Sequence, residues 1–221
     1  MPVLRPAHPG LLKWTINRYR LWWRGTRRKP PYNHCCQIGD PVLRRKAEPV
    51  NLETGLKEAQ QLVKQMQLVM RNHSACGLSA CQIGVPLSII AMEFTDSYLK
   101  LYSESVQKIY EIKTIPFTAV INPELVVLDN SVQLYTEGCE SMKGYKALVP
   151  RYRGVRLSGF NPEGEPIELD LVGWLARIAQ HEMDHINGEL YFDKMLPKSL
   201  ELEMWDAVNQ KGGKVDLRFS W

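Results

Sequence analysis

The stretch "AQHEMDHINGELY" at residues 179–191 places two histidines four positions apart in a helical pattern. Side chains at i and i+4 lie on one face of an α-helix, so His181 and His185 can bind the same ion. Glu182 follows the first histidine, where it can take a proton from a metal-activated water. The H-E-x-x-H pattern is typical of metal-dependent hydrolases. The alternative is a helix that carries two histidines and no metal.

The third ligand separates the classes of enzyme that use this pattern. One group of zinc proteases adds a third histidine three positions after a glycine. Gly188 matches that glycine, but Tyr191 occupies the ligand position. A second group takes a glutamate from a later helix, for which Glu201 and Glu203 are the candidates. A zinc endopeptidase therefore stays open as an alternative function.

A better third ligand lies upstream, where "EGCESM" places Cys139 in a tight turn after a predicted strand. A thiolate is a strong ligand for zinc and ferrous iron. One thiolate and two histidines leave a fourth position open for water, which is the catalytic arrangement. Taken alone, Cys139 could instead be a buried and inert thiol.

Hydrophobic periodicity predicts one α+β domain over residues 37–221, with mostly antiparallel sheets packed around a central metal-binding helix. Helical patterns cover residues 54–72, where Thr54 is the expected cap, and residues 173–190. Strand patterns cover residues 86–94, 117–129 and 132–142, and a hairpin covers residues 155–173. The tail predicts a helix over residues 199–210 and a last strand over residues 214–221.

Charge is distributed unevenly along the 221 residues, whose net charge is +4. Residues 1–39 carry eight Lys or Arg and no acid, so the rest of the chain is mildly acidic. That balance argues against a nucleic-acid site in the body. No apolar run reaches the length of a transmembrane helix, so we expect no transmembrane segment. Five cysteines, an odd and scattered set, predict free thiols in a reducing compartment.

The basic N-terminal extension, residues 1–36, has the pattern of a mitochondrial transit peptide. If it is helical, Leu12, Ile16, Tyr19 and Trp23 share one face, and basic residues lie on another. Arginine-rich, acid-free and amphipathic segments are typical of such peptides. The alternative is a basic tail that binds RNA or anionic lipid.

Three segments in order resemble the peptide deformylase family. They are "ACGLSACQ" at 75–82, "EGCES" at 137–141 and "QHEMDH" at 180–185, and "GDPVLR" at 39–44 and "LVPR" at 148–151 resemble further family segments. The resemblance spans residues 37–195 and is most similar to the animal mitochondrial branch. It implies a hydrolase that removes the formyl group from N-formylmethionyl nascent peptides in the mitochondrial matrix, with the mitochondrial ribosome as an expected partner. A family member that only binds formylated chains is a further alternative.

The resemblance also implies residue roles. A divalent metal, ferrous iron with zinc or cobalt as substitutes, would be held by Cys139, His181 and His185. Glu182 would act as general base and acid. The Gln82 side-chain amide and the backbone N–H of Glu140 would point at the developing oxyanion. Taken alone, the position of Gln82 favours a loop hydrogen-bonding role.

Substrate contacts are expected at three further positions. Gly77 would let the backbone approach the peptide, which pairs with it like an added strand. Trp174 and Ile178 would form the apolar pocket for the methionine side chain, although both could be plain core. Two departures from the family pattern stand out, Ala75 in place of a glycine and the acidic Glu140 after the metal cysteine. A carboxylate beside the metal predicts a slower enzyme than the bacterial type.

Overall fold

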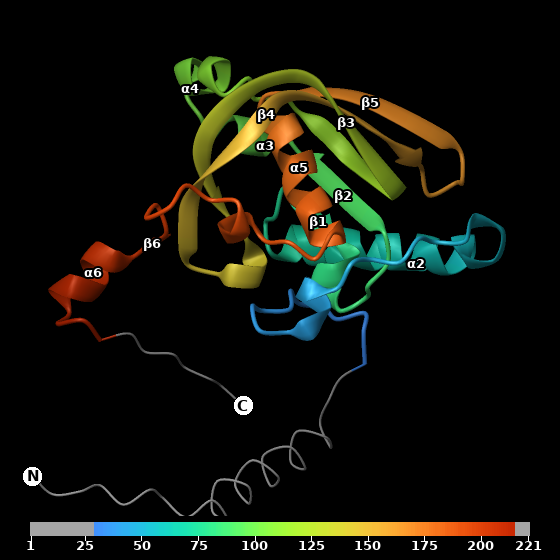
Figure 1. The fold of residues 1–221 in the computed structure, drawn as a ribbon, viewed down its shortest axis with the longest axis horizontal. Helices are drawn as coiled ribbons and strands as arrows, with labels where there is room; N and C mark the ends of the chain where they lie inside the picture. The colour runs from blue at the N-terminus through green and yellow to red at the C-terminus, as the bar shows by residue number, and fades with distance from the viewer. Residues whose placement is uncertain (1–28, 215–221) are drawn as a thin grey trace, which may run out of the picture.

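The computed structural model describes residues 29–214, which form an α+β fold (Figure 1). An antiparallel sheet curls around helix α5 (Trp174–Ile186), and helix α2 (Leu52–Asn72) lies outside the curl. The predicted fold class is therefore confirmed. The predictions for residues 1–28 and for the strand beyond Lys214 lie outside the described residues.

The sheet has six strands, of which five follow the chain order. They are β1 (Gly77–Ser79), β2 (Ile89–Phe94), β3 (Ile115–Gly138), β4 (Tyr145–Phe160) and β5 (Pro166–Val172), and β6 (Glu201–Leu202) pairs with β4. Every pair of neighbouring strands is antiparallel. The hairpin predicted at residues 155–173 is β4–β5.

Strand β3 corrects the prediction of two separate strands in this region. The segment around Asp129 has turn-like composition, but the Asp129 side chain accepts hydrogen bonds from the N–H and hydroxyl of Ser131 at 2.9 and 2.7 Å. The pairing with β4 shifts register on both sides of Asp129. The irregularity is absorbed as a bulge, and the strand continues to Gly138.

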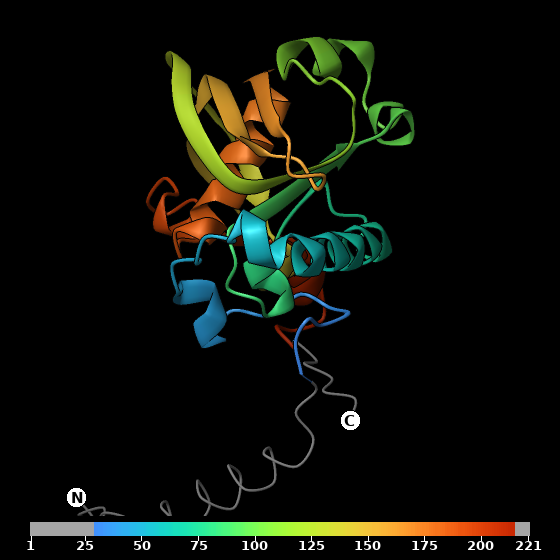
Figure 2. The same ribbon diagram turned by 90° about the vertical axis from the view of Figure 1, so that its right-hand side faces the viewer.

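Helix α2 begins at Leu52, two residues before the predicted start. Asn51 is the cap, because its side-chain oxygen accepts hydrogen bonds from the backbone N–H of Glu53 and Thr54 at 2.9 and 3.2 Å. The prediction that Thr54 caps this helix is therefore wrong. Figure 2 shows α2 below the curled sheet, at the opposite end from α3 (Asp96–Leu99) and α4 (Glu104–Ile109).

Helix α5 carries the "AQHEMDH" stretch through the middle of the fold. Its apolar side packs against β2 and the β4–β5 hairpin, in one core cluster with Ile90, Met92, Val155 and Leu157. Gly188 lies two residues after the end of α5 and has a φ of +74°. An added Cβ there would lie 2.8 Å from the carbonyl oxygen of Arg44. Gly188 thus serves the turn after α5.

Short elements complete the fold: 3₁₀ helices at Pro41–Arg44, Ala80–Ile83, Glu140–Met142 and Tyr191–Asp193, and helix α6 (Trp205–Gln210). The helix predicted at residues 199–210 is helical only from Trp205, because Glu201 and Leu202 pair instead with Lys146 and Tyr145 of β4. Across residues 29–214, no helix is long and apolar enough to cross a bilayer.

Candidate active site

The predicted metal ligands come together where β3 ends beside α5. One donor atom from each of Cys139, His181 and His185 lies within 4.8 Å of the others. The Cys139 Sγ is 3.3 Å from His185 Nε2. The endopeptidase candidates Glu201 and Glu203 are not members of this ligand group.

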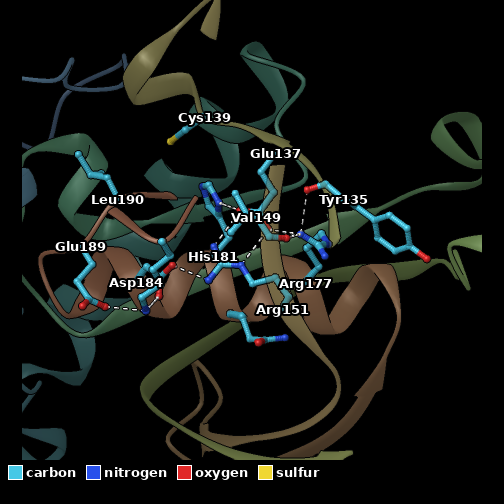
Figure 3. Close-up of polar contacts among 12 residues, drawn as sticks. Tyr135, Glu137, Cys139, Val149, Arg151, Arg177, His181, Asp184, Glu189 and Leu190 are labelled. Carbon is cyan, nitrogen blue, oxygen red and sulfur yellow. Dashed lines mark hydrogen bonds and ion pairs between the residues drawn. The ribbon is translucent and has the colours of Figure 1, made fainter. Parts of the chain in front are cut away.

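Glu137 fixes the orientation of His181. Its Oε2 lies 3.0 Å from His181 Nδ1. Both side chains are labelled in Figure 3. Burial raises the pKa of Glu137, but hydrogen bonds from Arg151 and His181 outweigh burial and hold that pKa well below its usual range. A carboxylate only accepts hydrogen bonds, so Nδ1 must carry the proton and Nε2 is left to bind a metal.

A buried ion-pair network holds Glu137 in turn (Figure 3). Arg151 on β4 donates to both of its carboxylate oxygens at 2.9 Å, and Arg177 on α5 donates to one at 2.7 Å. Arg151 also donates to Asp184 at 2.6 Å, and Lys194 contacts the same carboxylate. Asp184 therefore forms salt bridges with Arg151 and Lys194.

Sequence reasoning gave Glu137, Arg151 and Arg177 no role. Two signals were available in the sequence. Glu137 lies two positions before the metal cysteine in a strand, so both side chains point to the same face. Arg177 lies four positions before His181 on the side of α5 that faces β3, and a charged residue there requires a partner.

His185 is the most deeply buried ligand, with 1% of its surface exposed. Burial and the neighbouring His181 hold the pKa of His185 well below its usual range. Its imidazole is therefore neutral, as a metal ligand must be. Its Nδ1 has no hydrogen-bond partner within the part of the chain that the structure describes. A thiolate with two imidazole nitrogens suits zinc or ferrous iron, so these residues fit a metal centre.

Glu182 lies beside the ligand group and is 3% exposed. Burial raises its pKa to about 7. Its Oε2 has no partner among residues 29–214. Buried polar atoms are rarely left unpaired, so this oxygen is placed to meet a group that enters the site.

Gly77 makes room for Glu182. A Cβ at this position would lie 2.3 Å from Glu182 Oε1 and 2.9 Å from Ile178 Cγ2. No side chain fits without moving the carboxylate. This role adds to the predicted approach of a peptide to the Gly77 backbone, which stays a prediction.

The Gln82 side-chain amide is fixed toward the site. Its Oε1 accepts a hydrogen bond from the N–H of Ser79 at 2.9 Å, which determines which end of the amide is nitrogen. The Nε2 group lies 3.4 Å from Cys139 Sγ and 3.2 Å from Ser141 Oγ. The amide donor therefore faces the ligand group.

Glu140 follows Cys139 in the chain and is held on two sides. Gln37 donates to its backbone carbonyl at 2.7 Å. Its carboxylate Oε2 lies 3.2 Å from His73 Nδ1 and 3.5 Å from Lys143 Nζ. The contact with His73, 67 positions away, was not predicted from the sequence.

These residues surround one cavity of about 480 Å³. The predicted residues that line it are Gly77, Gln82, Cys139, Glu140, Trp174, Ile178, His181 and Glu182. Tyr102, from the segment between α3 and α4, lines it as well and was not predicted. Ile178 belongs to the core and also lines the cavity, while its contact with a methionine side chain stays a prediction.

Tyr191, at the third-histidine position of the zinc proteases, is structural. Its ring stacks on that of His181, with centroids 6.2 Å apart, and its hydroxyl donates to the Tyr145 carbonyl at 3.0 Å.

Comparisons with known proteins point to one family. The family model for polypeptide deformylase matches residues 33–201. The mitochondrial peptide deformylase of Homo sapiens is 40% identical over 197 residues, covering 86% of this chain and 81% of that protein. Peptide deformylase 2 of Pseudomonas syringae is 35% identical over 156 residues, covering 70% and 82%.

Solved structures give the same result. The peptide deformylase of Synechococcus elongatus superposes with a TM-score of 0.63 at 29% identity, covering 86% of this chain and 91% of that one. The enzyme from Thermotoga maritima gives 0.63 at 28% identity, covering 76% and 100%. A family of hydrolases that act on N-formyl peptides thus shares both the sequence and the fold, and the chain belongs to the polypeptide deformylase family.

Proposed function

We propose that this chain removes the formyl group from the N-terminal formylmethionine of polypeptides made in the mitochondrial matrix. Residues 37–221 would form the catalytic domain, and residues 1–36 would act as a transit peptide. The observation that carries the proposal is the buried carboxylate of Glu182, one oxygen of which has no partner within residues 29–214. It lines one cavity together with Cys139 and His181 of the Cys-His-His ligand group. The mitochondrial name of the human relative supports the location.

Cys139, His181 and His185 would hold the metal, which we propose to be ferrous iron, with zinc or cobalt as substitutes. When bound, a divalent cation supplies Lewis-acid chemistry, which polarises the formyl carbonyl and acidifies water. Glu137 supports this site by accepting from His181 Nδ1 at 3.0 Å. The ring orientation of His181 is therefore fixed before a metal binds.

Glu182 would carry out the proton transfers. It takes a proton from the attacking water and delivers it to the amine nitrogen when the C–N bond breaks. The products are formate and a peptide with a free N-terminal methionine. A carboxyl group whose pKa is about 7 can both accept and donate a proton near neutral pH.

Gln82 and Glu140 would stabilise the oxyanion. The Gln82 amide already faces the ligand group, and the Glu140 backbone is anchored by Gln37. Fixed donors lower the barrier because charge on the formyl oxygen grows only as water adds, and losing one such donor typically costs about 100-fold or more in rate. The Gly77 backbone would pair with the peptide, and Trp174 and Ile178 would contact the methionine side chain.

Formate release from formyl-Met-Ala-Ser, with cobalt or ferrous iron loaded under argon, tests the proposal. We expect turnover by the wild-type chain and loss of at least about 100-fold in Glu182→Gln with the metal retained. Glu189→Gln is the matched control, since this glutamate follows α5, is 46% exposed at its side chain and pairs with Lys194.

Two other outcomes would contradict the proposal. Bound metal without formate release would favour a protein that only binds formylated chains. Internal cleavage of an unformylated peptide would favour an endopeptidase.

The proposed location is tested separately, by fusing residues 1–36 to a fluorescent protein. Co-sedimentation with mitochondrial ribosomes tests that proposed partner.

A further inference from the structure

Glu140 lines the cavity and directly follows the metal ligand Cys139, and its carboxylate contacts His73 and Lys143. We propose that His73 and Lys143 form a clamp that holds this carboxylate away from the reaction centre. The clamp would keep an anionic side chain from opposing the oxyanion, while the Glu140 backbone remains available as a donor. This inference rests on the proposed deformylase function, and it adds two positioning residues to the site.

The contacts of the clamp come from separate elements. His73 caps the C-terminus of α2, and its backbone N–H donates to the Val69 carbonyl at 3.0 Å. Its Nδ1 reaches the Glu140 carboxylate at 3.2 Å, and Lys143 Nζ reaches the same oxygen at 3.5 Å. The side chains of His73 and Glu140 are 26% and 28% exposed, so solvent screens this contact only partly. Lys143 is 71% exposed and contributes less.

Hydrogen bonds anchor the backbone at Glu140 and at the next residue. Gln37 Nε2 donates to the Glu140 carbonyl at 2.7 Å, and the N–H of Ile38 donates to the Ser141 carbonyl at 2.7 Å. Cys139 precedes it at the ligand group. The carboxylate can therefore move mainly by side-chain rotation. Because Glu140 lines the cavity, we expect some of these rotations to direct the carboxylate into it once the clamp is removed.

The charge of a released carboxylate would act on the transition state. Repulsion between two like charges several ångströms apart in a partly buried site corresponds to roughly 10- to 100-fold in rate. Because the oxyanion exists only in the transition state, the loss should appear in kcat and leave KM nearly unchanged. The same reasoning revises the prediction from the sequence that the Glu140 carboxylate makes the enzyme slow. With the clamp intact, Glu140→Gln should raise kcat by no more than about 2-fold.

A double-mutant cycle tests the clamp. We expect His73→Ala to lower kcat about 10-fold when residue 140 is Glu and less than about 2-fold in the Glu140→Gln background. Lys143→Ala should show the same pattern with a smaller loss. His34→Ala is the matched control, because this exposed histidine stacks on Tyr32 instead and does not line the cavity. An equal loss in both backgrounds, or no loss in either, would overturn the proposal.

A second readout does not depend on turnover. In the cobalt-loaded protein, a released carboxylate would perturb the visible absorption of the ion in His73→Ala and not in His73→Ala/Glu140→Gln. If the wild-type chain releases no formate, the proposed function fails and these spectra still decide whether the clamp exists. Identical spectra in the two variants would then overturn it.

Discussion

Replacing Glu137 by glutamine should destabilise the protein and weaken metal binding together. The Glu137 carboxylate is 5% exposed and accepts four hydrogen bonds, two from Arg151, one from Arg177 and one from His181. Glutamine keeps the shape but loses the charge and replaces one acceptor oxygen with a donor. Arg177 is then left buried without an anion, and Arg151 keeps only Asp184.

The size of the effect follows from these contacts. Breaking a buried ion pair by removing one partner costs about 3–5 kcal/mol, because the remaining charge stays buried. That is a large share of a typical total stability of roughly 5–15 kcal/mol. The His181 ring also loses its fixed orientation, which typically costs about 10- to 100-fold in metal affinity.

Urea unfolding of the metal-free protein in chelator measures the first effect, and chelator competition for cobalt measures the second. Asp170→Asn is the control, since Asp170 forms a two-point pair with Arg156 at the surface and is 54% exposed at its side chain. We expect Asp170→Asn to lower the free energy of unfolding much less than Glu137→Gln does. A Glu137→Gln protein with the wild-type urea midpoint would refute the reasoning that the network supports the fold.

Three further predictions concern the same helix and its neighbours. Gly77→Ala should abolish most turnover while cobalt remains bound, since an added Cβ would lie 2.3 Å from Glu182 Oε1 and displace that carboxylate; formate release beside metal content checks this. The pKa of Glu182 is about 7 in the folded protein and about 4.3 in the unfolded chain, so between these pH values the folded protein binds the extra proton. The free energy of unfolding of the metal-free protein should therefore fall as pH rises from about 4.3 through about 7. Glu182→Gln should remove this slope, which amounts to about 3–4 kcal/mol in urea titrations from pH 4.5 to 8; parallel curves for the two proteins would exclude it. Asp184→Asn should lower metal retention less than Glu137→Gln, because Asp184 contacts Arg151 and Lys194 but no ligand; equal losses would place Asp184 closer to the metal site than the structure does.

The metal site was predictable because most of its residues lie in short and recognisable sequence motifs. His181, Glu182 and His185 share one helical turn, and Cys139 lies in a distinctive segment. The supporting contacts were not predictable, because they join residues far apart in the chain. His73 meets Glu140 across 67 positions and Arg177 meets Glu137 across 40. Local propensity says nothing about such pairs until the sheet register is known.

The sequence mispredicted element boundaries where specific hydrogen bonds, and not residue composition, decide the local structure. The segment at Asp129 resembles a turn, yet its side-chain bonds to Ser131 keep it within one strand. At the start of α2, both Asn51 and Thr54 are good caps, and only the observed hydrogen bonds distinguish them. In the tail, pairing with β4 converts Glu201 and Leu202 from helix to strand.

Cys139 and His181 are 42 positions apart, and the chain between them contains all of β4 and β5. An ion bound to both would act as a cross-link that exists only in the native state. Mass action then makes the free energy of unfolding rise by about 1.4 kcal/mol for each tenfold increase in free metal above the dissociation constant. The unfolding temperature would thus report the local supply of metal, and a shortage would shorten the life of the protein as well as slow its reaction.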